Sequence, residues 1–417
     1  TPLYSSAASD VYKRQEFYRK ATHGEGFIRG FFNVIKSATT GTGAALERLF
    51  ITGVSPVTMD DVTSGFNIGT NITNDSWFND LVGFSENELR EMLEYYKEQG
   101  VLQESIDEIV AMMKPNYDNY CFSEDTLEQC MFNSDMALYF LKSFVLHHKK
   151  PKEIVDPNIR TDFNKLAYLI KLDHGLGENF SVIKEIAEQG EIITDIVTHF
   201  SALEMTDPSN FKSLLFYFGL LSIKGVDMVG RPILHVPNLV VREQLFNFLI
   251  QGYIKHDIFK IDMNKMSALF ENMAFRGDWK PLFDFIANAV REQSRIREYI
   301  EGEAHIKGFL LAYLGMYRYY QLYPEYELNK GFADFFFKPS LSVPVLPPFT
   351  YLLEVKYAKA GASEKEIRAL ADEAREQLLR YSEDELVAEA KAKGELKLIT
   401  IVWRSWELVL LEEVTLS

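Results

Sequence analysis

Two carboxylates and one lysine in the C-terminal part of the chain occur at spacings that could build a metal site. In YLLEVKYA, the alternation of a strand places Glu354 and Lys356 on one face. In FADFFFKP, the same rule places Asp334 with Phe332 and Phe336. The twenty-residue separation of Asp334 and Glu354 lets the chain turn back and pair the two strands. Carboxylate oxygens suit Mg²⁺ or Mn²⁺, and the lysine could orient a water molecule or neutralise a developing oxyanion.

A Glu-x-Lys strand is also typical of a sheet edge whose charges face solvent. Against that interpretation, Asp334 lies between Phe332 and Phe335–Phe337, and Glu354 follows Tyr351–Leu353. Both carboxylates thus interrupt apolar strands, and burying them is costly unless a cation compensates their charge. If they meet without a metal, their repulsion should raise their pKa values. Asp334→Asn should then leave the metal-free protein at least as stable as the wild type.

Two expected helices each carry a polar residue on an otherwise apolar stripe. Glu303 begins the stripe that continues through Ile306, Leu310, Leu314 and Tyr317. Gln377 belongs to the stripe formed by Ile367, Leu370, Ala374, Gln377, Leu378 and Tyr381. A metal-and-phosphate site would give both residues a partner. A helix-end carboxylate near solvent and a buried amide bonded to backbone explain them equally well.

The elements that would position these groups form one unit over residues 299–417. The pattern after Arg297 predicts a helix at about 299–320, three strands ending with YLLEVKYAK, a helix at Ser363–Tyr381 and two closing strands. This order predicts an α/β domain with enough chain for one core.

The first two-thirds of the chain are expected to be mostly helical, so the fold class is α+β and multidomain. Capping-box spacings at Ser85 with Glu88 and at Ser105 with Glu108 predict two helix starts. Two apolar runs around a Gly-rich turn predict a β-hairpin within residues 220–238.

Composition limits the function classes. The 417 residues include 44 basic and 60 acidic side chains, a formal net charge of −16, which argues against general electrostatic coating of nucleic acid. A small nucleic-acid site that uses metal ions stays open. Cys121 and Cys130 are too few for a disulfide framework or a cysteine zinc site. The longest apolar run, Leu214–Ile223, is too short for a membrane span, and no secretory leader opens the chain. We expect a cytoplasmic protein without a membrane partner.

The first fifteen residues, TPLYSSAASDVYKRQ, are Ser- and Ala-rich and run abruptly into an amphipathic segment. We interpret residues 1–15 as a non-native leader, which implies that the natural protein is longer at its N-terminus. A disordered native tail is the alternative.

Five segments together resemble the PD-(D/E)XK nuclease superfamily: EGEAHIKGFLLAYL, YELNKGFADFFFKP, YLLEVKYAK, EAREQLLRY and ITIVWRSWELV. The resemblance covers about residues 299–417 and is closest to a bacterial group whose nuclease-like domain follows an AAA-ATPase-like region. It implies a restriction-endonuclease-like domain and a nuclease that uses Mg²⁺ or Mn²⁺ on DNA or RNA. The site residues that it implies are Asp334, Glu354 and the Val355 carbonyl as metal ligands, Lys356 as catalytic lysine, Glu303 as helix carboxylate and Gln377 as auxiliary polar residue.

The N-terminal part resembles the ATPase-like region of the same group. Leu49–Val54 would be a strand ending in Thr-Gly, where Thr52 would sense nucleotide phosphate in a full-length protein. The phosphate loop G-x-x-x-x-G-K-[ST] is absent from the sequence, so binding and hydrolysis of ATP are not expected from this truncated fragment. The domains implied are a leader (1–15), a remnant of an AAA-ATPase-like core (16–84), a helical lid and winged-helix-like region (85–298) and a nuclease-like domain (299–417).

Three functions therefore compete. The first is a metal-dependent nuclease with a truncated ATPase-like regulatory region. The second is a non-catalytic interaction or sensor protein that retains the nuclease fold, which the acidic balance of residues 299–417 favours, with 14 basic against 19 acidic side chains. The third is a small-molecule hydrolase that uses the same metal site. The choice between DNA and RNA, and the oligomeric state, stay open.

Overall fold

The chain forms two compact units in a computed structural model, residues 1–182 with 191–241, and residues 183–190 with 242–417. The chain passes from one unit to the other within α8 (Glu178–Gln189), again just after that helix at Gly190–Glu191, and a third time within α10 (Leu239–Lys255). Apart from isolated positions, the structure describes residues 26–39, 43–53, 70–148, 178–198, 207–293, 300–328, 331–340, 345–392 and 394–415.

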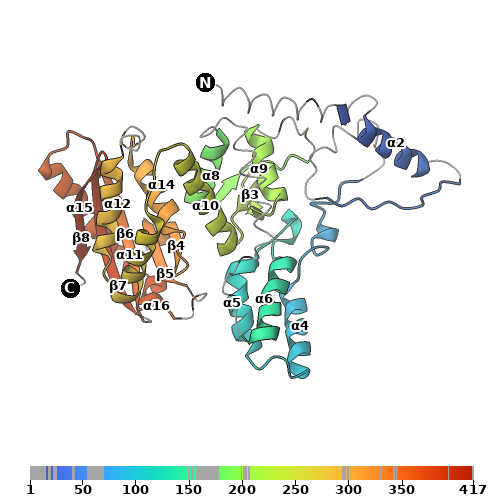
Figure 1. The fold of residues 1–417 in the computed structure, drawn as a ribbon, viewed down its shortest axis with the longest axis horizontal. Coiled ribbons are helices and arrows are strands. Elements are labelled where there is room, and N and C mark those ends of the chain that lie inside the picture. The colour runs from blue at the N-terminus through green and yellow to red at the C-terminus, as the bar shows by residue number, and fades with distance from the viewer. Residues whose placement is uncertain are drawn as a thin grey trace. The chain divides into compact units, whose positions relative to one another are not determined.

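Helices dominate the described part of the first unit (Figure 1). The α-helices are α2 (Phe27–Thr39), α4 (Glu86–Glu98), α5 (Ile106–Tyr117), α6 (Ser134–His147) and α9 (Pro208–Tyr217), with short 3₁₀ helices at Ser76–Phe78 and Glu124–Thr126. Leu89, Ile109 and Phe140 share one apolar core that joins α4, α5 and α6. The helical character predicted for this part of the chain is confirmed.

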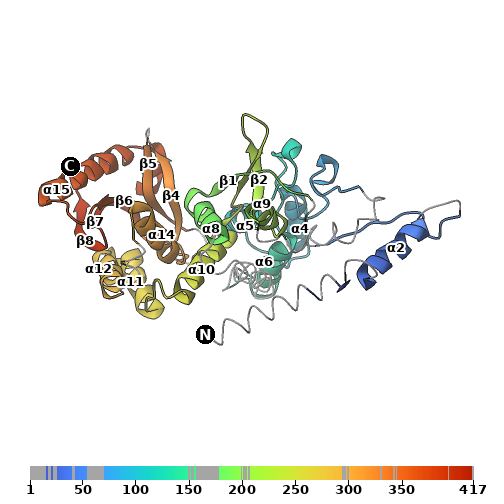
Figure 2. The same cartoon turned by 90° about the horizontal axis from the view of Figure 1, so that it is seen from above.

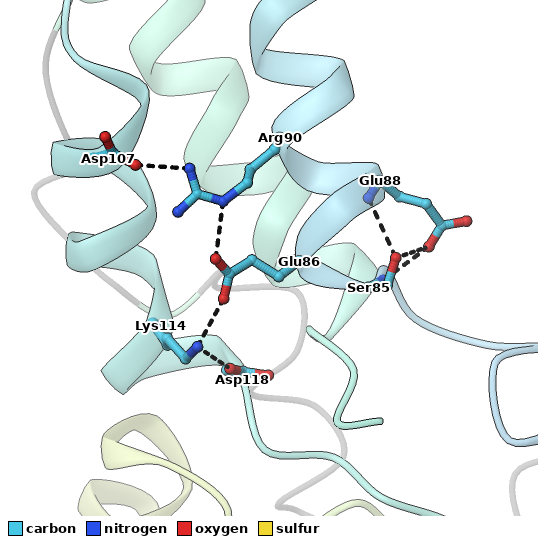
Figure 3. Close-up of polar contacts among 7 residues, drawn as sticks. All are labelled: Ser85, Glu86, Glu88, Arg90, Asp107, Lys114 and Asp118. Carbon is cyan, nitrogen blue, oxygen red and sulfur yellow. Dashed lines mark hydrogen bonds and ion pairs between the residues drawn. The ribbon is translucent and has the colours of Figure 1, made fainter. Parts of the chain in front are cut away.

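Polar contacts fix α4 against α5 (Figure 3). The Arg90 guanidinium bridges Glu86 and Asp107 at 2.9 and 2.7 Å. Lys114 donates to the other Glu86 oxygen at 2.7 Å and lies 3.9 Å from Asp118. Salt screens such exposed pairs, so their contribution to stability is small. Their main consequence is to set the registry of the two helices.

The two predicted capping boxes have different outcomes. At α4, Ser85 Oγ accepts from the Glu88 N–H at 3.2 Å and Glu88 Oε2 accepts from the Ser85 N–H at 2.8 Å, so the box is complete (Figure 3). At α5, Ser105 takes the N-cap position, but its side chain makes no capping hydrogen bond. The second box is therefore wrong, although the helix start is right.

Ser85→Ala is expected to lower the free energy of unfolding by about 1 kcal/mol, because it leaves the Glu88 N–H in the first turn of α4 without its acceptor. Ser105→Ala is the matched control and should change the free energy by only a few tenths of a kcal/mol. Urea denaturation of the full chain measures both. Equal losses of unfolding free energy in the two variants would contradict a complete capping box at α4 and its absence at α5.

A small antiparallel sheet completes the described part of the first unit. The predicted hairpin is confirmed as β2 (Ser222–Val226) and β3 (Pro232–His235). The three-residue strand β1 (Glu191–Ile193) adds to β3, so the order is β1-β3-β2. A three-residue strand is too short to show a period in the sequence.

The prediction of a strand at Leu49–Val54 is wrong for residues 49–53, the part of it that the structure describes. Residues 49–53 have no regular structure, and Leu49, Phe50 and Ile51 are exposed. Apolar composition alone does not make a strand, which needs a partner for its backbone groups. Thr52 is also exposed, and its expected role in phosphate sensing stays a prediction. The leader expected at 1–15 and residues 54–69 lie outside the described residues.

A five-stranded mixed sheet forms the centre of the second unit, in the order β4-β5-β6-β7-β8. The strands are β4 (Tyr320–Leu328), β5 (Gly331–Pro339), β6 (Phe349–Ala358), β7 (Glu395–Arg404) and β8 (Glu407–Val414). All neighbours are antiparallel except β6 and β7, which are parallel. The helices are α11 (Met263–Arg276), α12 (Lys280–Glu292), α14 (Glu303–Leu314), α15 (Glu364–Tyr381) and α16 (Glu385–Lys391). The predicted α+β fold class and the order helix, three strands, helix, two strands are confirmed, with α16 as an addition.

Helices cover both faces of this sheet (Figure 2). On one face, Phe336 and Leu352 pack with Leu378 of α15. On the other, the Tyr351 hydroxyl donates to the Met273 carbonyl at the end of α11 at 2.7 Å. The Trp279 indole before α12 donates to Glu413 of β8 at 2.9 Å. The compact unit around the sheet therefore starts before residue 299, while the domain boundaries themselves remain a prediction.

The helix expected at about 299–320 is shorter in the structure. α14 ends at Leu314, and Tyr317 stacks on Phe270 of α11 with ring centroids 4.5 Å apart. From Tyr320 the chain pairs with β5, because its aromatic residues gain more from a half-buried strand than from another helical turn. No helix among the described residues is long and apolar enough to span a bilayer.

Candidate metal centre and active site

Strands β5 and β6 bring Asp334 and Glu354 together. Their antiparallel register pairs Phe335 with Leu353, so continuing it by one residue sets Asp334 opposite Glu354. The backbone ladder stops there, and the Val355 N–H instead donates to Asp334 Oδ2 at 2.6 Å. The two acids predicted to share a site thus lie side by side on neighbouring strands.

Both acids are buried, Asp334 at 5% exposure and Glu354 at 2%. Burial and then the negative charge of Asp334 raise the pKa of Glu354 to about 9, against the opposing effect of Lys356. The expected rise in pKa is thus confirmed for Glu354. Its carboxyl carries a proton at neutral pH when no metal ion is near. A metal ion that binds a carboxyl must displace its proton, so metal binding at Glu354 would depend on pH.

Lys356 lies beside this pair on the face of β6 that α15 covers. Its ammonium is 3.8 Å from Glu354 Oε2 and 3.3 Å from Glu373 Oε1 of α15. Glu373 was missed in the sequence because it lies on the polar side of the expected stripe. The structure thus gives Lys356 a second carboxylate that fixes its direction.

Lys307 is the site residue that sequence reasoning missed most clearly. Its ammonium lies 2.5 Å from Asp334 Oδ1, 2.9 Å from Glu303 Oε1 and 3.0 Å from Glu325 Oε1. Burial is the largest single influence on the pKa of Lys307, and it lowers this pKa. The contacts with Asp334, Glu303 and Glu325 together outweigh burial and raise the pKa above its ordinary value. The available signal was the four-residue spacing of Glu303 and Lys307 on one helix.

Glu325 reaches Lys307 from an irregular point of β4. The register of β4 with β5 omits the pair Glu325–Asp334, and Glu325 has a left-handed backbone with φ of 44°. Such a conformation is costly for a non-glycine residue and is common at functional sites. The irregularity brings a third carboxylate to the ammonium that holds Asp334. No sequence pattern predicted it.

The two helix residues expected at the site have different environments. Glu303 is the first residue of α14, 40% of its side chain is exposed, and it pairs with Lys307. Gln377 lies one turn after Glu373 on α15, and its Oε1 is buried without a hydrogen-bond partner among the described residues.

Thr400 is the parallel partner of Glu354 on β7, and its buried hydroxyl also lacks such a partner within the described part of the chain. Thr400 is a further polar group that the sequence did not suggest.

The donor set fits a hard divalent cation. Glu354 Oε1 is buried and has no hydrogen-bond partner among the described residues, so a metal ion would satisfy an oxygen that the protein leaves unsatisfied. Oxygen donors from two carboxylates suit Mg²⁺ or Mn²⁺. Within the described residues, no group of three or more His, Cys, Asp or Glu side chains is arranged to hold a metal ion. The carboxylates around Lys307 are instead held by its ammonium.

Two family models match the chain. Residues 301–413 match the model of the PD-(D/E)XK nuclease superfamily, and residues 4–63 match the model described as a predicted AAA-ATPase. The resemblance stated from the sequence is confirmed for both regions. No curated protein matches the chain in sequence.

Proposed function

We propose, from the premise that residues 301–413 form a domain of the PD-(D/E)XK nuclease superfamily, that the chain is a nuclease that hydrolyses phosphodiester bonds with Mg²⁺ or Mn²⁺. The observation that carries the proposal is that β5 and β6 set two buried carboxyls, Asp334 and Glu354, opposite one another, with Lys356 beside Glu354. Glu354 Oε1 is buried without a hydrogen-bond partner among the described residues, which leaves this oxygen available to a cation.

Asp334, Glu354 and the Val355 carbonyl would hold the cation. When bound, the cation would supply a water of lowered pKa and neutralise phosphate charge. Lys356 would hold the attacking water or the developing oxyanion, with its direction set by Glu373. Gln377 and Thr400 offer unsatisfied polar atoms that could hydrogen bond to water or phosphate beside Glu354.

The AAA-ATPase-like region would regulate this activity rather than supply it. The sequence has no phosphate loop with its lysine and hydroxyl, so we expect no ATP hydrolysis by this polypeptide. The cytoplasm stays the predicted compartment of the protein. Nucleic acid is the proposed partner, as DNA or RNA.

Lys356→Met is expected to lower the rate of cleavage by about 10²–10³-fold, because it removes the charge that stabilises the transition state. Binding of Mn²⁺ should persist, since the carboxylates remain. Fluorescent single- and double-stranded DNA and RNA, incubated with the full chain and Mn²⁺ or EDTA, measure the rate. Lys397→Met is the matched control, since Lys397 is also a partly buried lysine between two carboxylates, and it should retain activity.

The second candidate is a non-catalytic interaction or sensor protein, favoured by the acidic balance of residues 299–417. The same assay separates the two functions. Cleavage by the wild type that requires the cation and Lys356 supports the nuclease. Binding of Mn²⁺ without cleavage of any of the four substrates would favour the sensor.

A further inference from the structure

The Lys307 ammonium lies among three carboxylates that come from three different elements. Glu303 belongs to α14, Glu325 to β4 and Asp334 to β5, and all three lie within 3.0 Å of Lys307 Nζ. The side chain is 18% exposed, so water screens these contacts only partly. One positive charge therefore balances a negative cluster at the edge of the proposed site.

Both oxygens of Asp334 already have a partner. Oδ1 contacts Lys307, and Oδ2 accepts the Val355 N–H. The Val355 N–H belongs to a strand whose whole length is paired with β7, so it cannot move without breaking that ladder. The lysine side chain has four rotatable bonds and can move. A cation that binds Asp334 therefore meets the competing positive charge of Lys307, which is the partner of Asp334 that can move away.

We propose that Lys307 is a resident counter-ion that holds Asp334 in the metal-free protein and is displaced when a divalent cation binds. This inference rests on the proposed function. Glu303 and Glu325 keep the displaced ammonium at the edge of the site, because both contact it independently of Asp334. The irregular backbone at Glu325 is what brings the second of these carboxylates within reach. Lys307 thereby stabilises the protein without metal and weakens its affinity for metal.

The test is calorimetric titration of MnCl₂ into the full chain, combined with thermal melts in EDTA. Lys307→Met should lower the Kd for Mn²⁺ by at least about tenfold, because the competing positive charge is gone. It should also lower the Tm in EDTA, since three carboxylates lose their counter-ion. Lys307→Gln, which can still hydrogen bond to the carboxylates, gives the same readout if the methionine variant does not fold.

Lys397→Met is the matched control. Lys397 is 13% exposed and lies 3.1 Å from each of Glu395 and Glu413, three residues along β7 from Thr400, the strand partner of Glu354. Its loss should lower the Tm in EDTA and leave the Kd for Mn²⁺ unchanged. If both Lys307 variants bind Mn²⁺ with a Kd equal to or higher than that of the wild type, the inference is overturned and the proposed function stays intact. Absence of Mn²⁺ binding in every variant, the wild type included, overturns both.

Discussion

Asp334→Asn is expected to lower metal-dependent cleavage by at least about a thousandfold. The variant keeps the size of the side chain but removes the charge that attracts the cation. It should also erase the rise in Tm that Mn²⁺ produces in the wild type, since a ligand stabilises only the state that binds it. Cleavage assays and melts with EDTA and with Mn²⁺ measure the two effects.

The structure changes the prediction for the stability of this variant without metal. Asp334 accepts the Val355 N–H and pairs with Lys307, so its loss leaves the lysine short of a partner. Asp334→Asn should therefore melt below the wild type in EDTA. The sequence alone predicted equal or higher stability, because it did not place Lys307 at the site.

Asp118→Asn is the matched control for Asp334→Asn. Asp118 is another buried carboxylate, beside Lys114 in the first unit, and burial raises its pKa. Its substitution should leave cleavage within about twofold of the wild type and keep the full shift in Tm with Mn²⁺. An Asp334→Asn variant that keeps the shift would remove Asp334 from the metal site.

Glu354→Gln is expected to stabilise the metal-free protein at pH 7.5 by roughly 2–4 kcal/mol. The pKa of Glu354 is about 9 in the folded chain against 4.5 as the ordinary value. Folding therefore favours the protonated carboxyl. Its contribution to stability is complete below about pH 4.5 and is lost as the pH rises toward 9. Glutamine has a similar shape and never ionises, so it avoids that loss.

The advantage of Glu354→Gln should shrink to less than about 1 kcal/mol at pH 5. At that pH the wild-type carboxyl is protonated in the folded chain, and the pH is only slightly above its ordinary pKa of 4.5 in the unfolded chain. Denaturation in EDTA at pH 5 and pH 7.5 measures the difference. Glu376→Gln, at an exposed position of α15, should show no such dependence on pH. Parallel curves for wild type and Glu354→Gln would refute the raised pKa and the buried acid pair.

The sequence predicts the parts of this site that depend on local periodicity. Asp334, Glu354 and Lys356 follow from strand alternation, and Ser363 with Glu366 caps α15 as the helix start predicted there requires. Lys307 and Glu325 could not be predicted in the same way. Their contacts depend on the distance between α14 and the sheet and on one irregular residue in β4, both of which arise only in the folded chain.

Element boundaries show the same division. The helix expected at about 299–320 has an apolar spacing that persists to Tyr317. It stops at Leu314, with Gly315 as its C-cap, and from Tyr320 the chain pairs with β5 as β4. A tertiary contact thus overrides the helical pattern, as it often does at the ends of elements.

Anomalous diffraction from crystals of the full chain soaked in MnCl₂ is the most direct test of the site. We expect a manganese peak within about 2.0–2.6 Å of carboxylate oxygens of both Asp334 and Glu354, with the Lys307 ammonium moved off Asp334. A site without a manganese peak, with Lys307 still on Asp334, would contradict the metal centre and the nuclease that depends on it.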